Sequence, residues 1–248
     1  MEKAAEHYLK ASEQGLALAH HNLAACYENG TGVEQNWEKA FECYLRAERQ
    51  GHFKSLYQLA LCYANGTGVD QNWIKAAEYF QKSADKGYVL SQYQLALCYE
   101  KGEGVDQSWP KAIEYYQKAA KQGNVMAKNN LALCYAEGKG VEQDLGKAAE
   151  YFKEAADQGF SEAQHNIAIL YASGKGVEQS WEKALEYYQK AADQGVANAQ
   201  YNLAICYARG IEVSQDSNKA REYLEKAAAQ GFKEATALLE DVRIRGGF

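Results

Sequence analysis

The stretches GKGVEQSWEKALEYYQKAADQG (residues 174–195) and AQYNLAICYARG (residues 199–210) together contain most of a motif that recurs along the whole chain. A glycine closes each copy at a fixed interval of 36 residues, without insertion or deletion: Gly15, Gly51, Gly87, Gly123, Gly159, Gly195 and Gly231. A period between about 20 and 50 residues indicates a repeat architecture. We therefore expect stacked units that offer an extended surface rather than a single catalytic pocket.

Each unit predicts two helices, as the second copy illustrates. Residues 54–65 carry apolar side chains at three- and four-residue steps, which is typical of an amphipathic helix that ends at Gly66. After a short loop, Asn72 is a favourable N-cap for a second helix over residues 73–86, which Gly87 ends. Neither helix can bury its apolar face alone, so neighbouring units must stack.

The fold class that follows is all-α, a right-handed α-solenoid of helix-turn-helix repeats resembling the tetratricopeptide superhelix. We expect one domain over residues 1–248, beginning with a half repeat and ending with a capping helix. The predicted boundaries are 1–15 for the half repeat, 16–51, 52–87, 88–123, 124–159, 160–195 and 196–231 for the full repeats, and 232–248 for the cap.

The six cysteines follow the repeat instead of forming a disulfide framework. Five share one position in the unit, and Leu170 fills that position in the fifth repeat, so it is an apolar core position. Equivalent residues of stacked helices lie about 9–10 Å apart, beyond the roughly 7 Å that a disulfide tolerates between Cα atoms. A bridge between Cys26 and Cys43 is the one pairing left open. Reduced cysteines favour a cytoplasmic location.

Charge and hydropathy exclude other classes of partner. The net charge is −6, whereas nucleic-acid binding calls for a basic face. No stretch approaches the roughly 18–20 apolar residues of a membrane span, and the N-terminus lacks a signal-peptide pattern. We expect a monomer that binds a protein or peptide, with no nucleic acid, no membrane insertion and no cofactor.

The repeated unit resembles the Sel-one-like repeat family, a relative of the tetratricopeptide repeat. The resemblance rests on Tyr201-Asn202-Leu203 in the first helix, the loop Gly174-Lys175-Gly176-Val177, Lys183-Ala184 and Ala191-Ala192, and it covers essentially the whole chain. The chain departs from the family in having Ala after the Leu, no Pro before the loop glutamine, and Glu212 in place of a loop glycine. It has one cysteine in most units, unlike the branch of the family with two per repeat.

Motifs that suggest chemistry have simpler structural interpretations. Three Ser-x-x-Lys sequences match the spacing of penicillin-recognising enzymes, but Ser108 and Ser180 align with N-cap residues. The Gly-x-Gly loops lack the strand and spacing of a nucleotide site. His20 and His21 have no companion ligands for a metal. We expect no enzymatic activity. Two N-glycosylation sequons, at Asn29 and Asn65, matter only in an exported or lumenal protein.

The family resemblance implies that first helices line a concave groove, and three positions of the unit are the candidates for binding there. An aromatic or polar position holds His21, Tyr57, Tyr93, Asn129, His165 and Tyr201. The next position is always an amide: Asn22, Gln58, Gln94, Asn130, Asn166 and Asn202. A variable position contributes Leu18, Leu90 and Met126. Amides can pair with a peptide backbone and rings supply contact area, although the amides could instead bind each other and only stabilise the stack.

The function predicted is a non-enzymatic scaffold or adaptor that holds a peptide or protein partner in its groove. Three alternatives stay open at this point. The chain could be an exported host-interaction factor or an adaptor of quality control in the endoplasmic reticulum lumen. It could be an idealised array without a native partner. The most distant alternative is a hydrolase that recognises β-lactams.

Overall fold

The computed structural model describes residues 2–245, and these residues form fourteen helices and no strand. They belong to two compact units, one ending at Asn124 and the other beginning at Val125. The first unit contains α1 (Glu2–Glu13), α2 (Ala17–Asn29), α3 (Trp37–Arg49), α4 (Phe53–Asn65), α5 (Trp73–Asp85), α6 (Val89–Lys101) and α7 (Trp109–Lys121). The second contains α8 (Val125–Glu137), α9 (Leu145–Ala156), α10 (Ser161–Ser173), α11 (Trp181–Asp193), α12 (Ala197–Arg209), α13 (Ser217–Ala229) and α14 (Lys233–Arg245).

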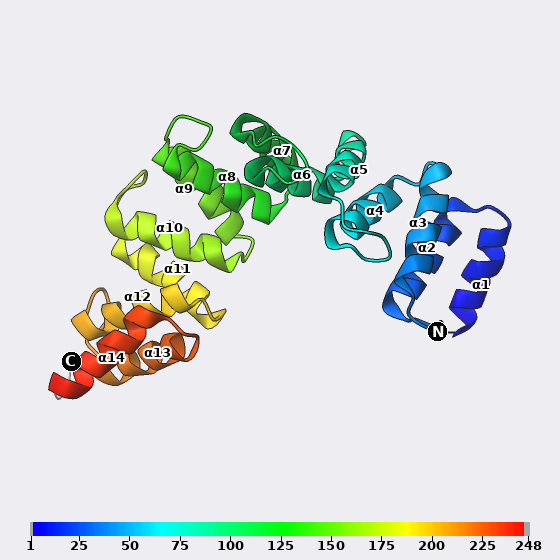
Figure 1. The fold of residues 1–248 in the computed structure, drawn as a ribbon. Coiled ribbons are helices and arrows are strands. Elements are labelled where there is room, and N and C mark those ends of the chain that lie inside the picture. The colour runs from blue at the N-terminus through cyan, green and yellow to red at the C-terminus, as the bar shows by residue number, and fades with distance from the viewer. Residues whose placement is uncertain (1, 246–248) are drawn as a thin grey trace. The chain divides into compact units, whose positions relative to one another are not determined.

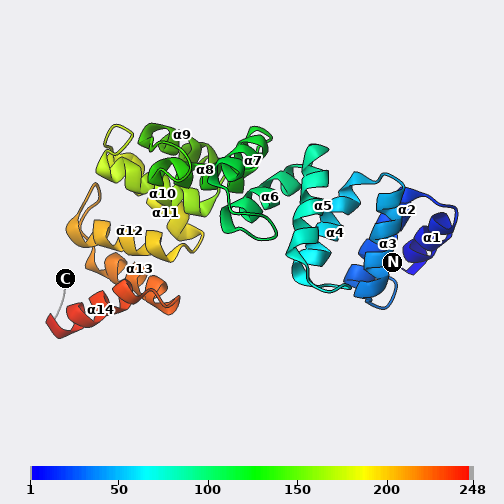
Figure 2. The same ribbon diagram turned by 45° about the horizontal axis from the view of Figure 1, so that its top comes forward.

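Within each unit, every helix packs against the helices before and after it in the chain, as Figures 1 and 2 show. The even-numbered helices are the first helices of the repeats, and the odd-numbered helices are the second ones. This arrangement confirms the predicted all-α helix-pair repeat fold. The division into one domain with the stated repeat boundaries stays a prediction, and residues 1 and 246–248 of its end segments lie outside the described residues.

The second helices begin where the sequence predicts, at an N-cap that follows the loop. The side chains of Asn36, Asn72, Asp144, Ser180 and Asp216 each accept a hydrogen bond from the backbone N–H three residues later. Ser108 also occupies the N-cap position with the same extended backbone, but its side chain makes no cap bond. Its helix instead has Pro110 in the first turn, a position that already lacks a partner for its N–H.

The loops between the two helices are closed by a glutamine and held close by a glycine. In every full repeat the glutamine side chain donates to a carbonyl in the last turn of the first helix, as Gln71 does to Ala64 at 2.7 Å. The second loop glycine takes a positive φ and approaches the preceding repeat. A Cβ on Gly104 would lie only 1.9 Å from the carbonyl oxygen of Trp73. The Gly-x-Gly sequence therefore allows close packing between repeats.

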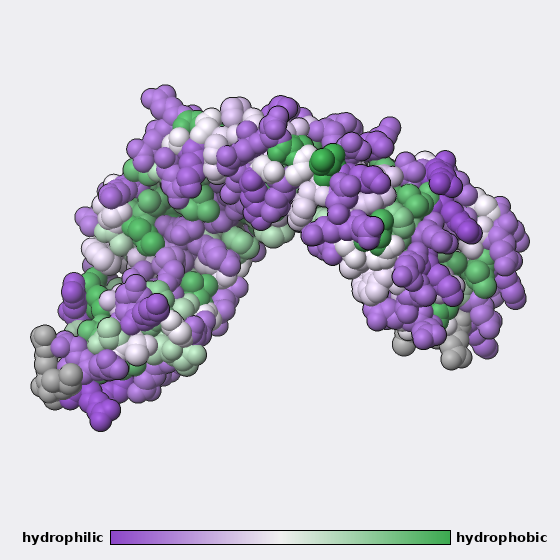
Figure 3. Space-filling model, viewed as in Figure 1, coloured by the Kyte–Doolittle hydropathy of each residue, from purple (hydrophilic) through white to green (hydrophobic). Residues whose placement is uncertain are grey.

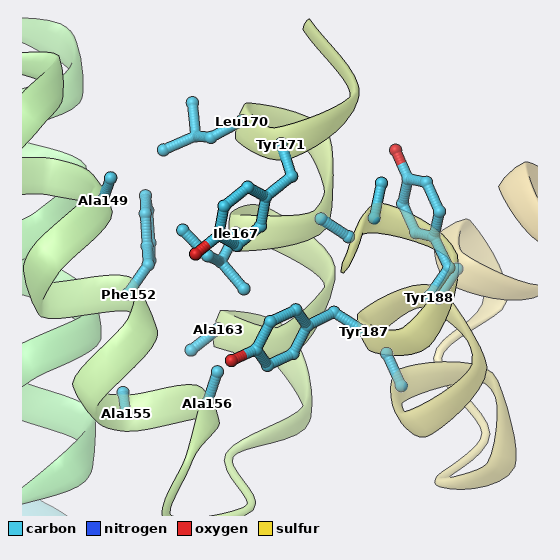
Figure 4. Close-up of a cluster of buried hydrophobic side chains, with 14 of the residues drawn as sticks. Ala149, Phe152, Ala155, Ala156, Ala163, Ile167, Leu170, Tyr171, Tyr187 and Tyr188 are labelled. Carbon is cyan, nitrogen blue, oxygen red and sulfur yellow. The ribbon is translucent and has the colours of Figure 1, made fainter. Parts of the chain in front are cut away.

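The core of each unit alternates small and large side chains. In the second unit, Phe152, Ile167 and Tyr171 interlock with alanines of neighbouring helices, and Tyr187 and Tyr188 leave α11 in different directions (Figure 4). All six cysteines are buried and none forms a disulfide. Burial raises the pKa of Cys62 and Cys206 to about 11, so these thiols stay protonated and serve as apolar packing groups.

Candidate partner-binding face

The exposed sides of the first helices carry the predicted binding positions. The variable position lies farthest out: Leu18 is 60% exposed and Met126 is 37% exposed, whereas Leu90 is half-buried. One turn further along the same side is the amide position, which is half-buried in every repeat. We call this side of α2, α4, α6, α8, α10 and α12 the first-helix face, and consider it separately in each unit.

The aromatic position lies at the edge of this face and packs inward. Its ring contacts a ring of the second helix of the same repeat, with centroid distances of 5.9 Å for Tyr57–Phe80 and 6.0 Å for His165–Tyr188. It also contacts the residue that begins the next repeat, as Tyr57 does Tyr88 at 5.3 Å and Tyr201 does Phe232 at 5.3 Å. Tyr93 contacts Tyr116 at 6.0 Å. These side chains therefore offer a ring edge rather than a whole ring to a partner.

The amide position connects adjacent repeats. The Asn202 amide nitrogen lies 3.2 Å from Nε2 of His165 in the preceding repeat, and Asn166 donates to Asn129 at 3.5 Å. Asn129, at 6% exposure, is buried and makes this internal link instead of contributing surface. Asn130 and Gln94 share the same position in their repeats. Some of the side chains at the amide position therefore stabilise the contact between repeats. Fewer of their hydrogen-bonding groups are then available to a peptide backbone.

A fourth position on this face was missed in the sequence. One turn beyond the amide, the chain places an aliphatic side chain in every repeat: Ala25, Leu61, Leu97, Leu133, Ile169 and Ile205. Leu133 is 36% exposed and Ile169 is 40% exposed, although both lie in the middle of their helices. The sequence contains a signal for this position, because a large aliphatic residue recurs at a step that the buried side of the helix does not require. The signal is hard to recognise because the residues before and after it are apolar too.

Together these positions form a surface of mixed apolar and amide side chains. The surface in Figure 3 is mainly hydrophilic, with hydrophobic residues in small separate patches. On the first-helix face, aliphatic and amide side chains alternate along each helix and repeat from one helix to the next within a unit. Such a surface supplies apolar contact area together with hydrogen-bonding groups, as peptide-recognition surfaces do.

Where the first and second repeats meet, this face includes a pair of histidines on a buried serine. Nδ1 of His21 and Nδ1 of His52 both lie 3.0 Å from Oγ of Ser55, and the two rings are 4.4 Å apart between centroids. Burial, then His52 and Lys54, lower the pKa of His21 to about 4. The cluster contains no acid to orient a catalytic base, and none of the described residues forms a group of three or more metal-binding side chains.

Two of the Ser-x-x-Lys sequences, at Ser180 and Ser83, have structural roles in the described part of the chain. Ser180 uses its Oγ to accept the backbone N–H of Lys183 at 3.3 Å, which is a cap bond. Ser83 is fully buried in α5, at a position where other repeats have alanine, while Lys86 is exposed at the helix end. A nucleophile needs a base within reach and an approach for substrate, and these serines lack that arrangement.

Two-helix repeats with a 36-residue period define a helical repeat protein of the α-solenoid class. The model of the Sel1 repeat matches residues 1–16, 17–52, 54–88, 89–124, 125–160, 161–196 and 197–232. The chain therefore belongs to the Sel1 repeat family, whose repeats generally serve as protein–protein interaction modules. The resemblance read from the sequence is confirmed. No curated protein sequence matches the chain significantly.

Solved structures show the same fold. A protective antigen present in uropathogenic Escherichia coli strains, described as displaying an SLR fold, is 31% identical with a TM-score of 0.89. The match covers 92% of this chain and 49% of that one, so this chain spans about half its length. A Sel1 repeat protein from Oxalobacter formigenes is 30% identical, with a TM-score of 0.81 and coverage of 91% and 90%. Among the described residues, no helix is both long and apolar enough to cross a membrane.

Proposed function

We propose that the protein is a non-enzymatic scaffold that binds an extended protein segment on the first-helix face. The observation that carries this proposal is the aliphatic position, exposed at Leu133 and Ile169 and repeated with the 36-residue period. A packing role does not account for exposed aliphatic side chains at the centre of a helix, and repeated exposed apolar groups among polar ones are typical of interaction surfaces.

The neighbouring positions supply the rest of the recognition surface. Leu18, Leu90 and Met126 vary in type between repeats, so they are the side chains best suited to give sequence preference. Met adapts its shape to different partners at low cost. Some amide groups are not used up by bonds between repeats. These groups pair with the backbone of the partner. The rings of Tyr57, Tyr93 and Tyr201 flank the surface and position the amides.

The test compares charge introduced on this face with the same charge introduced elsewhere. Peptides are first selected from a random display library on the wild-type protein, and their affinities are measured by fluorescence anisotropy. We expect L133E together with I169E to weaken binding at least tenfold, because a carboxylate then has to be buried without a partner. The matched control is I74E, since Ile74 is 64% exposed on a second helix. Equal effects of both changes, or no effect of the first, would contradict the proposal.

We further propose a reducing compartment, consistent with cytoplasmic residence, because all six cysteines are buried and none forms a disulfide. Titration of free thiols on protein isolated from its native source tests this. Six reactive thiols after unfolding are expected, and cysteine-linked adducts or a glycan on Asn29 or Asn65 would contradict it.

The alternative of an exported adaptor that acts in host interaction has one specific observation in its favour. The 31% identical relative is a protective antigen present in uropathogenic strains, which is a statement about that protein. Fractionation of native cells, followed by immunoblotting, separates the two locations: recovery outside the cytoplasm favours the exported adaptor.

A further inference from the structure

Five repeats share a stack of two tyrosines that the partner-binding face does not use. In each, the last tyrosine of the first helix lies parallel to a tyrosine in the middle of the second helix. Ring centroids are 5.6–6.0 Å apart and interplanar angles are 5–17°, in the pairs Tyr63–Tyr79, Tyr99–Tyr115, Tyr135–Tyr151, Tyr171–Tyr187 and Tyr207–Tyr223. Figure 4 shows the pair in the fifth repeat. Offset parallel rings at this distance attract each other beyond the area they bury.

The surroundings of this stack are known in detail from Tyr187. Its ring lies under Nζ of Lys190, 5.1 Å from the centroid, and its hydroxyl donates to a carboxylate oxygen of Asp157 at 2.8 Å. Nζ of Lys183 covers the other tyrosine, Tyr171, at 5.2 Å. The Tyr187 phenol is therefore stacked on a ring, covered by a cation and hydrogen-bonded to an acid, whereas the equivalent Tyr115 and Tyr223 bond the side chains of Gln81 and Gln189.

The first repeat has equivalent surroundings but lacks the tyrosine ring of the second helix. Cys43 stands where the other repeats have the second-helix tyrosine, and Tyr27 has no ring partner among residues 2–245. A cavity of about 310 Å³ lies at this place, near the lower end of the range for small-ligand pockets. Its lining includes the residues equivalent to those around Tyr187: Tyr27 for Tyr171, Lys39 for Lys183, Arg46 for Lys190 and Glu13 for Asp157.

A buried polar group points to a ligand as well. His20 lines the cavity, is only 6% exposed, and its Nδ1 has no hydrogen-bond partner. At the same position the third, fifth and sixth repeats have a glutamine that bonds a backbone carbonyl. Burial, and then Arg46, lower the pKa of His20, so the imidazole is neutral near pH 7. A buried polar atom left unpaired is costly, and the oxygen of a bound phenol can accept a hydrogen bond from this nitrogen when Nδ1 carries the imidazole proton.

We propose that the cavity between α1, α2 and α3 binds a phenolic ring, either a tyrosine side chain of a partner protein or a free phenol. The ring stacks on Tyr27, at the place that the chain fills with its own tyrosine in five other repeats. The hydroxyl donates to Glu13, and Arg46 covers the outer face of the ring. This site is separate from the first-helix face, so it stands whether or not that face binds a peptide.

The test is an NMR titration of the full chain, with the backbone amides of Tyr27, Cys43 and Arg46 as reporters. The probes are 4-methylphenol, N-acetyltyrosinamide and N-acetylphenylalaninamide. We expect saturable shifts with 4-methylphenol in the millimolar range. Binding of the tyrosine amide as well identifies a side chain as the occupant, and binding of 4-methylphenol alone identifies a free phenol. Equal binding of the phenylalanine amide, or no saturable shift with either phenol, overturns the proposal.

Two variants test the cavity, one by filling it in the first repeat and the other by opening an equivalent cavity in the fifth repeat. C43Y places the chain's own ring on Tyr27 and should weaken 4-methylphenol binding at least tenfold while raising the melting temperature. Y187C opens the same space beside Tyr171 and Asp157, and should add a second binding site whose shifts map to α10 and α11. Circular dichroism checks that both variants fold. If C43Y is folded and binds 4-methylphenol as the wild type does, the cavity is not the site.

Discussion

The hydroxyl of Tyr44 donates a hydrogen bond to a carboxylate oxygen of Glu28 at 2.5 Å, inside the first repeat. Tyr44 is almost fully buried, and burial together with Glu28 holds its pKa far above the ordinary value. Tyr116 and Glu100 make the same bond in the third repeat. The second repeat places Phe80 and Ala64 at these two positions, and the fourth places Phe152 and Ala136. The fifth repeat departs from this pairing, because it has Tyr188 at the tyrosine position and Ala172 at the acid position.

Removing the acid alone should cost more than removing both groups. E28A leaves the buried Tyr44 hydroxyl without its acceptor, and we expect the free energy of unfolding to fall by about 1–3 kcal/mol. Adding Y44F to E28A reproduces the pair found in the second repeat and should restore part of that loss. Urea unfolding of the wild type, both single variants and the double variant gives the coupling energy. Additive losses would show that the bond contributes nothing specific.

A second prediction concerns pH and the His21–His52 pair. The pKa of His21 is lowered from about 6.5 to about 4 on folding, so the unfolded chain binds a proton in this window that the folded chain does not. The free energy of unfolding therefore falls as pH is lowered from about 6.5 to about 4, by up to about 1.4 kcal/mol per pH unit for this group. The lowered pKa of His52 acts in the same direction.

The variant H21Y separates this contribution from the rest, because tyrosine occupies the same position as Tyr57 and Tyr93 in the next two repeats. Unfolding curves in urea at pH 4.5, 5.5, 6.5 and 7.5 measure the effect. We expect a smaller slope between pH 4.5 and 6.5 for the variant than for the wild type. Parallel dependences would mean that His21 takes up its proton equally in both states.

A third prediction compares two buried serines at positions where most other repeats have alanine. Oγ of Ser83 has no hydrogen-bond partner in the described structure, whereas Oγ of Ser55 contacts both His21 and His52. S83A should raise the free energy of unfolding by about 1 kcal/mol, because it removes an unpaired buried hydroxyl. S55A deletes the same atom with the opposite effect, a loss of about 1–2 kcal/mol. Thermal and urea unfolding of both variants measure these changes in the free energy of unfolding. A destabilised S83A would be inconsistent with an unpaired hydroxyl.

The helices and their ends were predictable because their signals are local. Asn72 and Gly66 act through hydrogen bonds within four residues, and the 36-residue period then applies one repeat's assignment to all the others. The cysteine assignment also held, since Leu170 at the shared position reveals a core environment. Ser108 makes no side-chain cap bond, although Ser180 makes one at the equivalent position. A serine at the N-cap therefore permits the bond, but the local geometry determines whether it forms.

The site was less predictable because it depends on contacts between repeats. The bond from Asn202 to His165 joins residues 37 apart, and the sequence does not say whether an amide faces a neighbour or solvent. The exposed Ile169 could not be separated from the buried Ile167 without the orientation of α10. Cys43 looked like a disulfide candidate, and only the tyrosine stack of the other repeats shows what it replaces.

Glu212 provides the last prediction, since it is the one residue other than glycine with a positive φ, 53°, among residues 2–245. The other five full repeats have glycine at this loop position. A left-handed backbone costs a residue with a Cβ about 1–2 kcal/mol, while glycine loses about 0.4–1 kcal/mol more entropy on folding. E212G should therefore raise the free energy of unfolding by up to about 1 kcal/mol, measured in urea. The converse control is G176A, whose new Cβ would lie 2.1 Å from the carbonyl oxygen of Leu145, so it should destabilise strongly. If G176A were tolerated and E212G neutral, the close approach of loop and helix would not be what selects glycine here.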